Sequence, residues 1–244
     1  MKIPPNVFVF DTSEQLALAA AERFVQYAVE SQEMMDRFSV ALAGGKTPKR
    51  VYELLATAQF KSRVKWSGVH FFFGDERCVP PNHPESNYAM VYEALFSKVE
   101  IPAQNVHRMI GEGDTSDNAL AYEIQLKAFF AGRDWPRFDL VLLGIGKDGH
   151  TASLFPGSDA IKETSRWVVT TEDKQSGHQR LTLTLPAINH AARIAFLATG
   201  TEKAATLSEL LAGQSVSHRL PASLIHPVDG TIEWLITTDA RSDL

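Results

Sequence analysis

The sequence predicts an α/β protein built around a largely parallel sheet. Short apolar runs rich in β-branched or aromatic residues alternate with longer segments in which apolar residues recur at helical spacing. This alternation is typical of strand–helix units around a parallel sheet. Several of the short runs end in glycine-rich or charged turns, and ligand sites of open α/β sheets lie beyond the carboxyl ends of their strands.

The predicted strands are short, apolar and bounded by turn residues. They cover residues 7–10, 38–43, 69–73, 140–143, 167–170, 181–185, 194–198 and 231–236. The run at 69–73 has no polar break except one histidine, which indicates a buried strand.

The predicted helices begin at capping or first-turn residues. Thr12 and Gln15 have capping-box spacing, so a helix is expected from there to about residue 31. Pro48 is placed as a first-turn proline in a helix that runs through Leu55. Further helices are predicted over residues 87–96, 118–131 and 202–211.

Length and composition indicate one globular domain. The chain has 244 residues, of which 44% are hydrophobic and 22% charged, as in ordinary globular proteins. No Pro/Gly/Ser-rich or charged linker divides it, so residues 1–244 are expected to form a single domain.

The lack of a targeting pattern and the single cysteine favour a cytoplasmic protein. The chain shows no signal-peptide pattern and no apolar run of about 18 residues, so a cytoplasmic protein outside the membrane is expected. Its single cysteine, Cys78, excludes an internal disulfide and a multi-cysteine zinc site.

The charge of the chain restricts its ligands. A formal net charge of −5 argues against a general nucleic-acid binder, which needs a surplus of Lys and Arg on one face. An anionic ligand must therefore meet a local basic site. The sequence does not specify an oligomeric state.

A glycine turn follows the strand at 38–43. Gly44, Gly45, Lys46 and Thr47 lead into the next helix, and the glycines let backbone N–H groups approach a ligand at the start of that helix. This arrangement favours phosphate, although the spacing is not that of a nucleotide P-loop. The alternative is an ordinary turn.

Two carboxylates and a guanidinium follow the strand at 69–73. Arg77 suits an anionic oxygen, and Asp75 suits a sugar hydroxyl or the orientation of another group. The alternative is a solvated loop with an internal ion pair. Residues 86–88 are expected to cap the next helix, which makes Asn87 structural.

Residues 144–157 are the most informative segment. Of eight histidines, His150 is the one placed among glycines after a strand. An imidazole titrates near neutral pH, so it can take a proton from water and return it to a leaving oxygen, as ester hydrolysis requires. Asp148 is expected to fix the tautomer of His150 or to bind backbone N–H groups.

Two further cationic side chains are candidates for binding an anion. Arg180 stands at the head of the strand at 181–185, and Lys203 stands at the start of the helix at 202–211. A lysine there opposes the helix dipole, so a bound anion would relieve the conflict. The alternative for Lys203 is a solvated side chain. No His/Asp/Glu set has recognisable ligand spacing, so no metal is expected.

Four motifs taken together resemble one family, which holds 6-phosphogluconolactonases and glucosamine-6-phosphate deaminases. They are residues 44–48, residues 75–77 with 86–88, residues 146–156, and Arg180 before Leu181 and Thr182. The resemblance spans nearly the whole chain. It implies a Rossmann-like three-layer α/β fold with helices on both faces of the sheet. It also implies hydrolysis of 6-phospho-D-glucono-1,5-lactone in the pentose phosphate pathway, with a small sugar phosphate as ligand and no organic cofactor.

The resemblance also separates two branches of this family. The deaminases carry a glutamate five residues after the histidine, where this chain has Phe155, and a tyrosine where it has Arg77. Both differences favour the lactonase branch. A third hypothesis is a sugar-phosphate sensor without turnover, which would keep the phosphate residues and lose the base. His150 is present, so catalysis is favoured over sensing.

Overall fold

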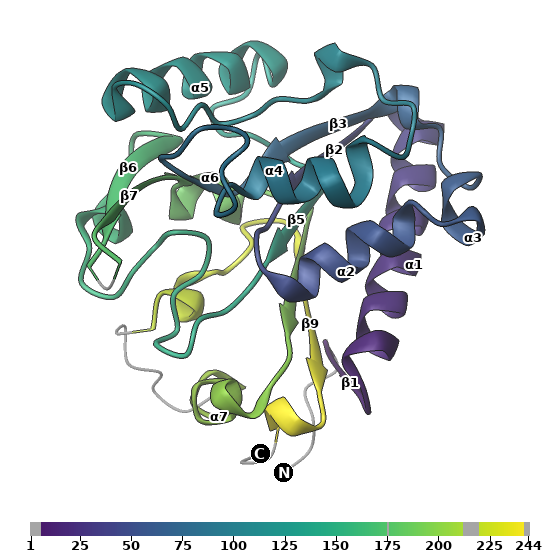
Figure 1. The fold of residues 1–244 in the computed structure, drawn as a ribbon. Coiled ribbons are helices and arrows are strands. Elements are labelled where there is room, and N and C mark those ends of the chain that lie inside the picture. The colour runs from purple at the N-terminus through teal and green to yellow at the C-terminus, as the bar shows by residue number, and fades with distance from the viewer. Residues whose placement is uncertain (1–5, 175, 212–219, 242–244) are drawn as a thin grey trace.

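The central sheet of the protein consists of parallel strands in the order β1-β9-β8-β5-β2-β3 (Figure 1). The computed structural model describes residues 6–174, 176–211 and 220–241. The strands are β1 (Val7–Phe10), β2 (Phe38–Leu42), β3 (Val69–Phe73), β5 (Leu140–Leu143), β8 (Arg193–Ala198) and β9 (Thr231–Thr237). All five pairings between neighbours are parallel, so the carboxyl ends of these strands meet at one edge of the sheet.

Helices flank this sheet and complete the three-layer α/β architecture that was expected (Figure 1). They are α1 (Ser13–Met35), α2 (Lys46–Leu55), α3 (Ala58–Lys61), α4 (Asn87–Val91), α5 (Thr115–Phe129), α6 (Leu185–Asn189) and α7 (Ala204–Leu211). The long α1 packs against α2 and against the strands β1, β2 and β9. It buries Leu16, Ala20 and Phe24 at helical spacing.

The capping residues explain where the helices differ from their predicted bounds. Thr12 accepts a hydrogen bond from the Gln15 N–H, as predicted, but α1 continues to Met35 and ends at Asp36, whose φ of 54° is left-handed. Helix α5 starts three residues earlier than predicted, because Asp114 accepts from the N–H groups of Ser116 and Asp117.

A second, antiparallel sheet lies beside the first, with the order β4-β7-β6. Its strands are β4 (Asp75–Arg77), β6 (Val168–Asp173) and β7 (His178–Leu183). The apolar runs at 167–170 and 181–185 therefore form strands as predicted, but outside the parallel sheet. The short strand β4 was not predicted at all. A backbone hydrogen bond of 2.8 Å from Leu183 N to Gly74 O joins the two sheets where β3 ends.

The order of the strands predicts a ligand crevice between β2 and β5, because the connections from these strands run to opposite sides of the sheet. From β2 the chain passes to β3 on one side, whereas β5, β8 and β9 follow on the other side. Ligands of open α/β sheets bind at such a switch point, outside the carboxyl ends of the strands. The segments that follow β2 and β5 are the two turns to which the sequence assigned the phosphate and His150.

Candidate active site

His150 lies in the turn after β5 and is paired with Asp148. The distance from His150 Nδ1 to Asp148 Oδ1 is 2.6 Å, and the side chains are 35% and 30% exposed. Gly146 makes room for this pair, since a Cβ on it would lie 2.2 Å from His150 Nδ1. Because Asp148 accepts at Nδ1, we infer that the Nε2 atom of the neutral ring carries the free lone pair.

Two adjoining cavities open around this histidine. The larger, of about 440 Å³, is lined by Asp148, Phe155 and Arg180 among others. The smaller, of about 210 Å³, is lined by residues 43–48 and by Lys203. Four residues line both cavities: Asp75, Arg77, His150 and Ala152. The structure thus gathers all the predicted site residues around one histidine.

The predicted phosphate turn begins α2. Gly45 is the N-cap of this helix and has a φ of 101°, which favours glycine. Gly44 is required for a different reason, because a Cβ there would lie 2.0 Å from Asn87 Oδ1. Thr47 Oγ1 lies 2.9 Å from Thr199 Oγ1, which follows β8. Lys46 is exposed and lines the smaller cavity.

Asp75 and Glu76 on β4 are both buried, with different partners. Asp75 Oδ2 accepts from Ser153 Oγ at 2.7 Å, and Asp75 Oδ1 accepts from Asn87 Nδ2 at 3.2 Å. Glu76 accepts from Ser86 Oγ and from the N–H groups of Asn87 and Tyr88, so it caps the start of α4. Burial raises the pKa of Glu76, although these N–H donors oppose the effect. The structural role expected for Asn87 agrees with these contacts.

Arg77 and Arg180 face each other across the β4–β7 pair. Arg77 donates to the Glu85 carbonyl. Arg180 Nη2 lies 3.0 Å from Asp173 Oδ2, so part of its charge is already paired. Within the described residues, the buried Nε atoms of both arginines lack a hydrogen-bond partner. Both side chains line the larger cavity, so their guanidinium groups are placed to meet an anionic ligand there.

Lys203 ends a 3-10 turn, Thr201–Lys203, that precedes α7. The side chain lines the smaller cavity with Gly44 and Gly45. Burial lowers the pKa of Lys203, and nearby Glu202 partly offsets this effect. A half-buried ammonium group beside a glycine turn is a suitable partner for phosphate.

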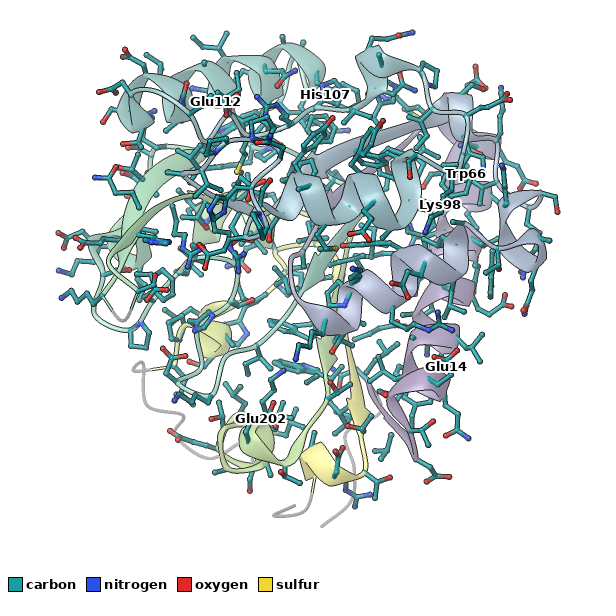
Figure 2. The ribbon with its side chains drawn as sticks, in the orientation of Figure 1. Glu14, Trp66, Lys98, His107, Glu112 and Glu202 are labelled. Carbon is teal, nitrogen blue, oxygen red and sulfur yellow. The ribbon has the colours of Figure 1, made fainter. Side chains whose placement is uncertain are left out.

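Other histidines lie in different surroundings. His107 is buried beside α5 (Figure 2), with its ring stacked on Phe72 at a centroid distance of 4.2 Å. Burial and the neighbouring His70 lower the pKa of His107 to about 4. Neither His70 nor His107 lines the two cavities around His150.

Several cavity residues were not predicted from the sequence. Lys147, Ser153 and Ser158 line the larger cavity with Glu172 and Lys174. Lys147 and Ser153 lie in segment 144–157, where their closeness in sequence to His150 could have indicated them. Glu172 and Lys174, at the end of β6, could not have been found in this way, because only the fold of the β6–β7 hairpin brings them to the cavity.

Residues 6–174, 176–211 and 220–241 form neither a cluster of metal ligands nor a membrane-spanning helix. In this part of the chain, no three or more His, Cys, Asp or Glu side chains come together as metal ligands. Nor does it contain a helix of sufficient length and apolar character to cross a bilayer. The expectation that no metal takes part stays a prediction.

Comparison with known proteins identifies relatives over most of the chain. The 6-phosphogluconolactonase of Synechocystis sp. is 40% identical over 210 residues, which are 84% of this chain and 84% of that protein. The 6-phosphogluconolactonase of Aggregatibacter actinomycetemcomitans is 33% identical over 235 residues, which are 96% of this chain and 98% of the relative.

Solved structures agree with these relatives. The structure of 6-phosphogluconolactonase from Trypanosoma brucei has a TM-score of 0.88 and 31% identity, and covers 100% of both chains. A monomeric glucosamine-6-phosphate deaminase, at 24% identity and a TM-score of 0.81 over 97% of this chain and 99% of that one, shares the fold. The model of the family described as glucosamine-6-phosphate isomerases/6-phosphogluconolactonase matches residues 11–234. The chain belongs to this family.

Proposed function

We propose that this protein hydrolyses 6-phospho-D-glucono-1,5-lactone to 6-phosphogluconate in the pentose phosphate pathway. The observation that carries the proposal is the His150–Asp148 pair, which opens onto cavities lined by a glycine turn, Arg77 and Lys203. The family relatives named above, which are lactonases at 33–40% identity, support the same reaction.

The first step needs a base beside the lactone carbonyl. His150 Nε2 takes a proton from a water molecule while the water oxygen bonds to C1, which gives a tetrahedral intermediate with a negative oxygen. The imidazolium that forms is stabilised by Asp148 at 2.6 Å. This pairing also fixes the orientation of the ring.

The second step returns the proton. As the intermediate collapses, the bond between C1 and the ring oxygen breaks, and His150 Nε2 protonates that oxygen. The products are a hydroxyl group at C5 and a carboxylic acid at C1, which ionises at neutral pH. His150 ends the cycle neutral, so one residue serves as base and then as acid.

The phosphate is assigned to the cationic side of the cavities. Residues 44–47 supply backbone N–H groups, and Arg77 and Lys203 supply charge next to them. Arg180 reaches the site from the larger cavity, where Asp173 already occupies one of its nitrogens. We therefore expect Arg77 and Lys203 to contribute more than Arg180 to phosphate affinity.

The test is a direct comparison of substrates. Freshly made 6-phosphogluconolactone should release acid faster with the protein than in a protein-free control, because δ-lactones also open spontaneously. Unphosphorylated gluconolactone should react clearly more slowly, since each charged phosphate contact contributes about 1.5–3 kcal/mol. Equal rates on both lactones would show that no phosphate is held.

The same assay separates the alternatives. Glucosamine 6-phosphate should release no ammonia, because Phe155, with its ring centroid 5.0 Å from that of His150, cannot shuttle protons as a carboxylate does. Ammonia release would place the chain in the deaminase branch. Binding of 6-phosphogluconate without turnover of either substrate would support the sensor instead.

A metal is not part of the proposed reaction, because His150 activates the water directly. Full activity is expected after exhaustive chelation. Activity that chelation removes and an added divalent metal restores would contradict this prediction. The cytoplasmic location expected from the sequence stays a prediction, which cell fractionation would test.

A further inference from the structure

The turn that follows His150 has a strained backbone. Ala152 has a φ of 48°, in the left-handed region that disfavours residues with a Cβ. It lies inside a tight turn closed by a 2.9 Å hydrogen bond from Leu154 N to Thr151 O. Ala152 also lines both cavities. Strain at such a position persists only where neighbouring contacts fix the conformation.

Ser153 supplies those contacts. The residue is 2% exposed, and its hydroxyl donates to Asp75 Oδ2 at 2.7 Å. Its backbone N–H donates to Thr182 Oγ1 at 3.2 Å. Thr182 is fully buried, and Asp75 is held in turn by Asn87. The residue after the strained alanine is thus fixed through both its backbone and its side chain.

The groups that hold Ser153 belong to the strands that carry the two arginines. Asp75 is directly opposite Thr182 in the β4–β7 pair, and Arg77 is directly opposite Arg180. Side chains two residues apart on a strand lie on the same face. The pair of Asp75 and Thr182 therefore fixes the His150 turn, while the pair of arginines two residues along the ladder lines the cavity with guanidinium groups.

We propose that Ser153 is a positioning residue for the reaction. Its hydroxyl fixes the strained turn to the β4–β7 ladder, so that His150 and the phosphate-binding cations share one rigid frame. The inference rests on the proposed function. It also selects between the two roles expected for Asp75, which then orients Ser153 and holds the turn rather than binding a sugar hydroxyl.

The test compares two buried serines with matched surroundings. Ser39 on β2 is also 2% exposed and donates to a carboxylate, Asp139 Oδ2, at 2.6 Å, but it lines neither cavity. Ser153→Ala should lower kcat by about 10-fold or more, because small displacements of a catalytic group are costly. KM and the Kd of 6-phosphogluconate should stay within about 3-fold. Ser39→Ala should leave kcat unchanged.

The substitution Ser153→Ala in an Ala152→Gly protein tests whether Ser153 acts by holding the strained turn. Glycine adopts a positive φ without steric cost, so Ala152→Gly should reduce the need for Ser153. The fold loss in kcat caused by Ser153→Ala should be smaller in the Ala152→Gly background than in the wild-type background. If Ser153→Ala does not fold, Thr182→Val replaces it and should lower kcat, while Thr182→Ser should retain it.

Other results would overturn the proposal. They are a wild-type kcat in Ser153→Ala, an equal loss in Ser39→Ala, equal losses in both backgrounds, or a product Kd that rises in step with the loss of kcat. Failure of the proposed function is distinct, because the wild-type protein itself would then not open the lactone. Amide exchange over residues 144–157, which should become faster in Ser153→Ala and not in Ser39→Ala, tests the positioning role without using activity.

Discussion

Asp148 pairs with Nδ1 of His150, and the roles proposed for these two residues have separate tests. His150→Asn should lower kcat by about 10²-fold or more and leave the Kd of 6-phosphogluconate nearly unchanged, because it removes the base and keeps the phosphate contacts. Asp148→Asn should also lower kcat, since an amide cannot stabilise the imidazolium. Steady-state kinetics and calorimetry of product binding provide these measurements.

The pH profile adds a second measurement for the same residue. A general base must be unprotonated to accept a proton, so kcat/KM should fall as the pH is lowered. His226→Asn is the control and should keep the wild-type pH profile of kcat/KM, because this histidine lines neither cavity. Near-normal turnover in His150→Asn would remove His150 from the proposed role.

Lys203 is expected to favour ligand binding at the expense of stability. Burial lowers its pKa, which means that the folded protein disfavours the charged ammonium group. At neutral pH, below the ordinary value for lysine, this charge opposes folding until an anion binds. Lys203→Met should therefore leave the Tm of the free protein unchanged or raise it. KM and the Kd of 6-phosphogluconate should rise together by about 10- to 100-fold, the equivalent of one charged contact.

The control for Lys203 is a lysine elsewhere on the surface. Lys98 is exposed and lies in a different part of the molecule (Figure 2), so Lys98→Met should leave both constants unchanged. Thermal unfolding with and without 6-phosphogluconate separates the two effects on Lys203. A lower Tm of the free Lys203→Met protein with unchanged product affinity would contradict the phosphate assignment.

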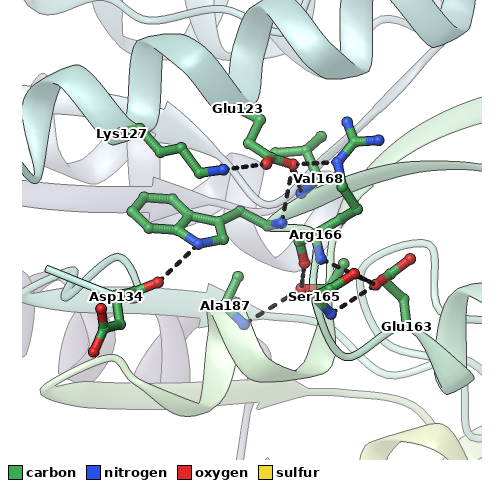
Figure 3. A network of polar contacts seen from close by, with 10 residues as sticks. Glu123, Lys127, Asp134, Glu163, Ser165, Arg166, Val168 and Ala187 are labelled. Carbon is green, nitrogen blue, oxygen red and sulfur yellow. Dashed lines mark hydrogen bonds and ion pairs between the residues drawn. The ribbon is translucent and has the colours of Figure 1, made fainter.

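Among the elements, α5 is joined to β6 by a buried carboxylate (Figure 3). Glu123 on α5 pairs with Lys127 at 2.6 Å and with Arg166 at 2.7 Å, and accepts from the backbone N–H groups of Trp167 and Val168. Burial alone would raise the pKa of Glu123, but these four donors outweigh it and the pKa is lowered. The network fixes the position of β6, whose last residues line the larger cavity.

This network predicts a pH-dependent stability. The lowered pKa means that Glu123 stabilises the fold above the ordinary pKa of a glutamate, about 4.3, and loses this effect as the pH falls through the folded-state value. Glu123→Gln should lower the free energy of unfolding at pH 7 by about 1–3 kcal/mol. The difference from wild type should shrink below about pH 4.

Urea unfolding at several pH values checks this expectation. Glu112→Gln is the control, because Glu112 pairs with Arg108 at the surface and should change stability by less than about 1 kcal/mol. A wild-type unfolding free energy for Glu123→Gln at pH 7 would show that the network in Figure 3 contributes nothing to stability.

The sequence predicted those elements whose structure depends on the pattern of their own residues. The strands of the parallel sheet are apolar runs that end in turn residues, and each was placed within one or two residues of its observed bounds. Strand β4 was missed because Asp75, Glu76 and Arg77 look like a solvated loop. Their charges are satisfied by Ser153, by the start of α4 and by the Glu85 carbonyl, none of which is adjacent in sequence.

The candidate site was predictable to the same extent. His150, Asp148 and the glycine turn follow strands directly, so their chemistry could be inferred from position along the chain. The ion pair between Arg180 and Asp173 depends on how the β6–β7 hairpin pairs, and the bond between Ser153 and Asp75 depends on how the antiparallel sheet docks against the His150 turn. No local pattern encodes that docking, since the bond joins residues 78 apart in sequence.

For the whole molecule, the prediction of a single domain requires that the two sheets unfold together. Leu181, Leu183 and Val168 of the antiparallel sheet belong to the same buried cluster as Phe73 and Leu42 of the parallel sheet. A shared core of this kind favours one cooperative transition, because unfolding one sheet would expose buried side chains that pack in the same cluster as those of the other.

The tryptophans allow each sheet to be followed separately. Trp135 and Trp167 stack on each other at a centroid distance of 6.3 Å next to β6, whereas Trp66 precedes β3 and Trp234 lies on β9. Trp66→Phe/Trp234→Phe therefore reports on the antiparallel sheet, and Trp135→Phe/Trp167→Phe on the parallel sheet. The fluorescence midpoint of each variant in urea should coincide with its own midpoint from circular dichroism, which follows the whole chain. A fluorescence transition displaced from the circular dichroism transition in either variant would divide the chain into two units, and the His150 turn, which contacts both sheets, would then lie at their boundary.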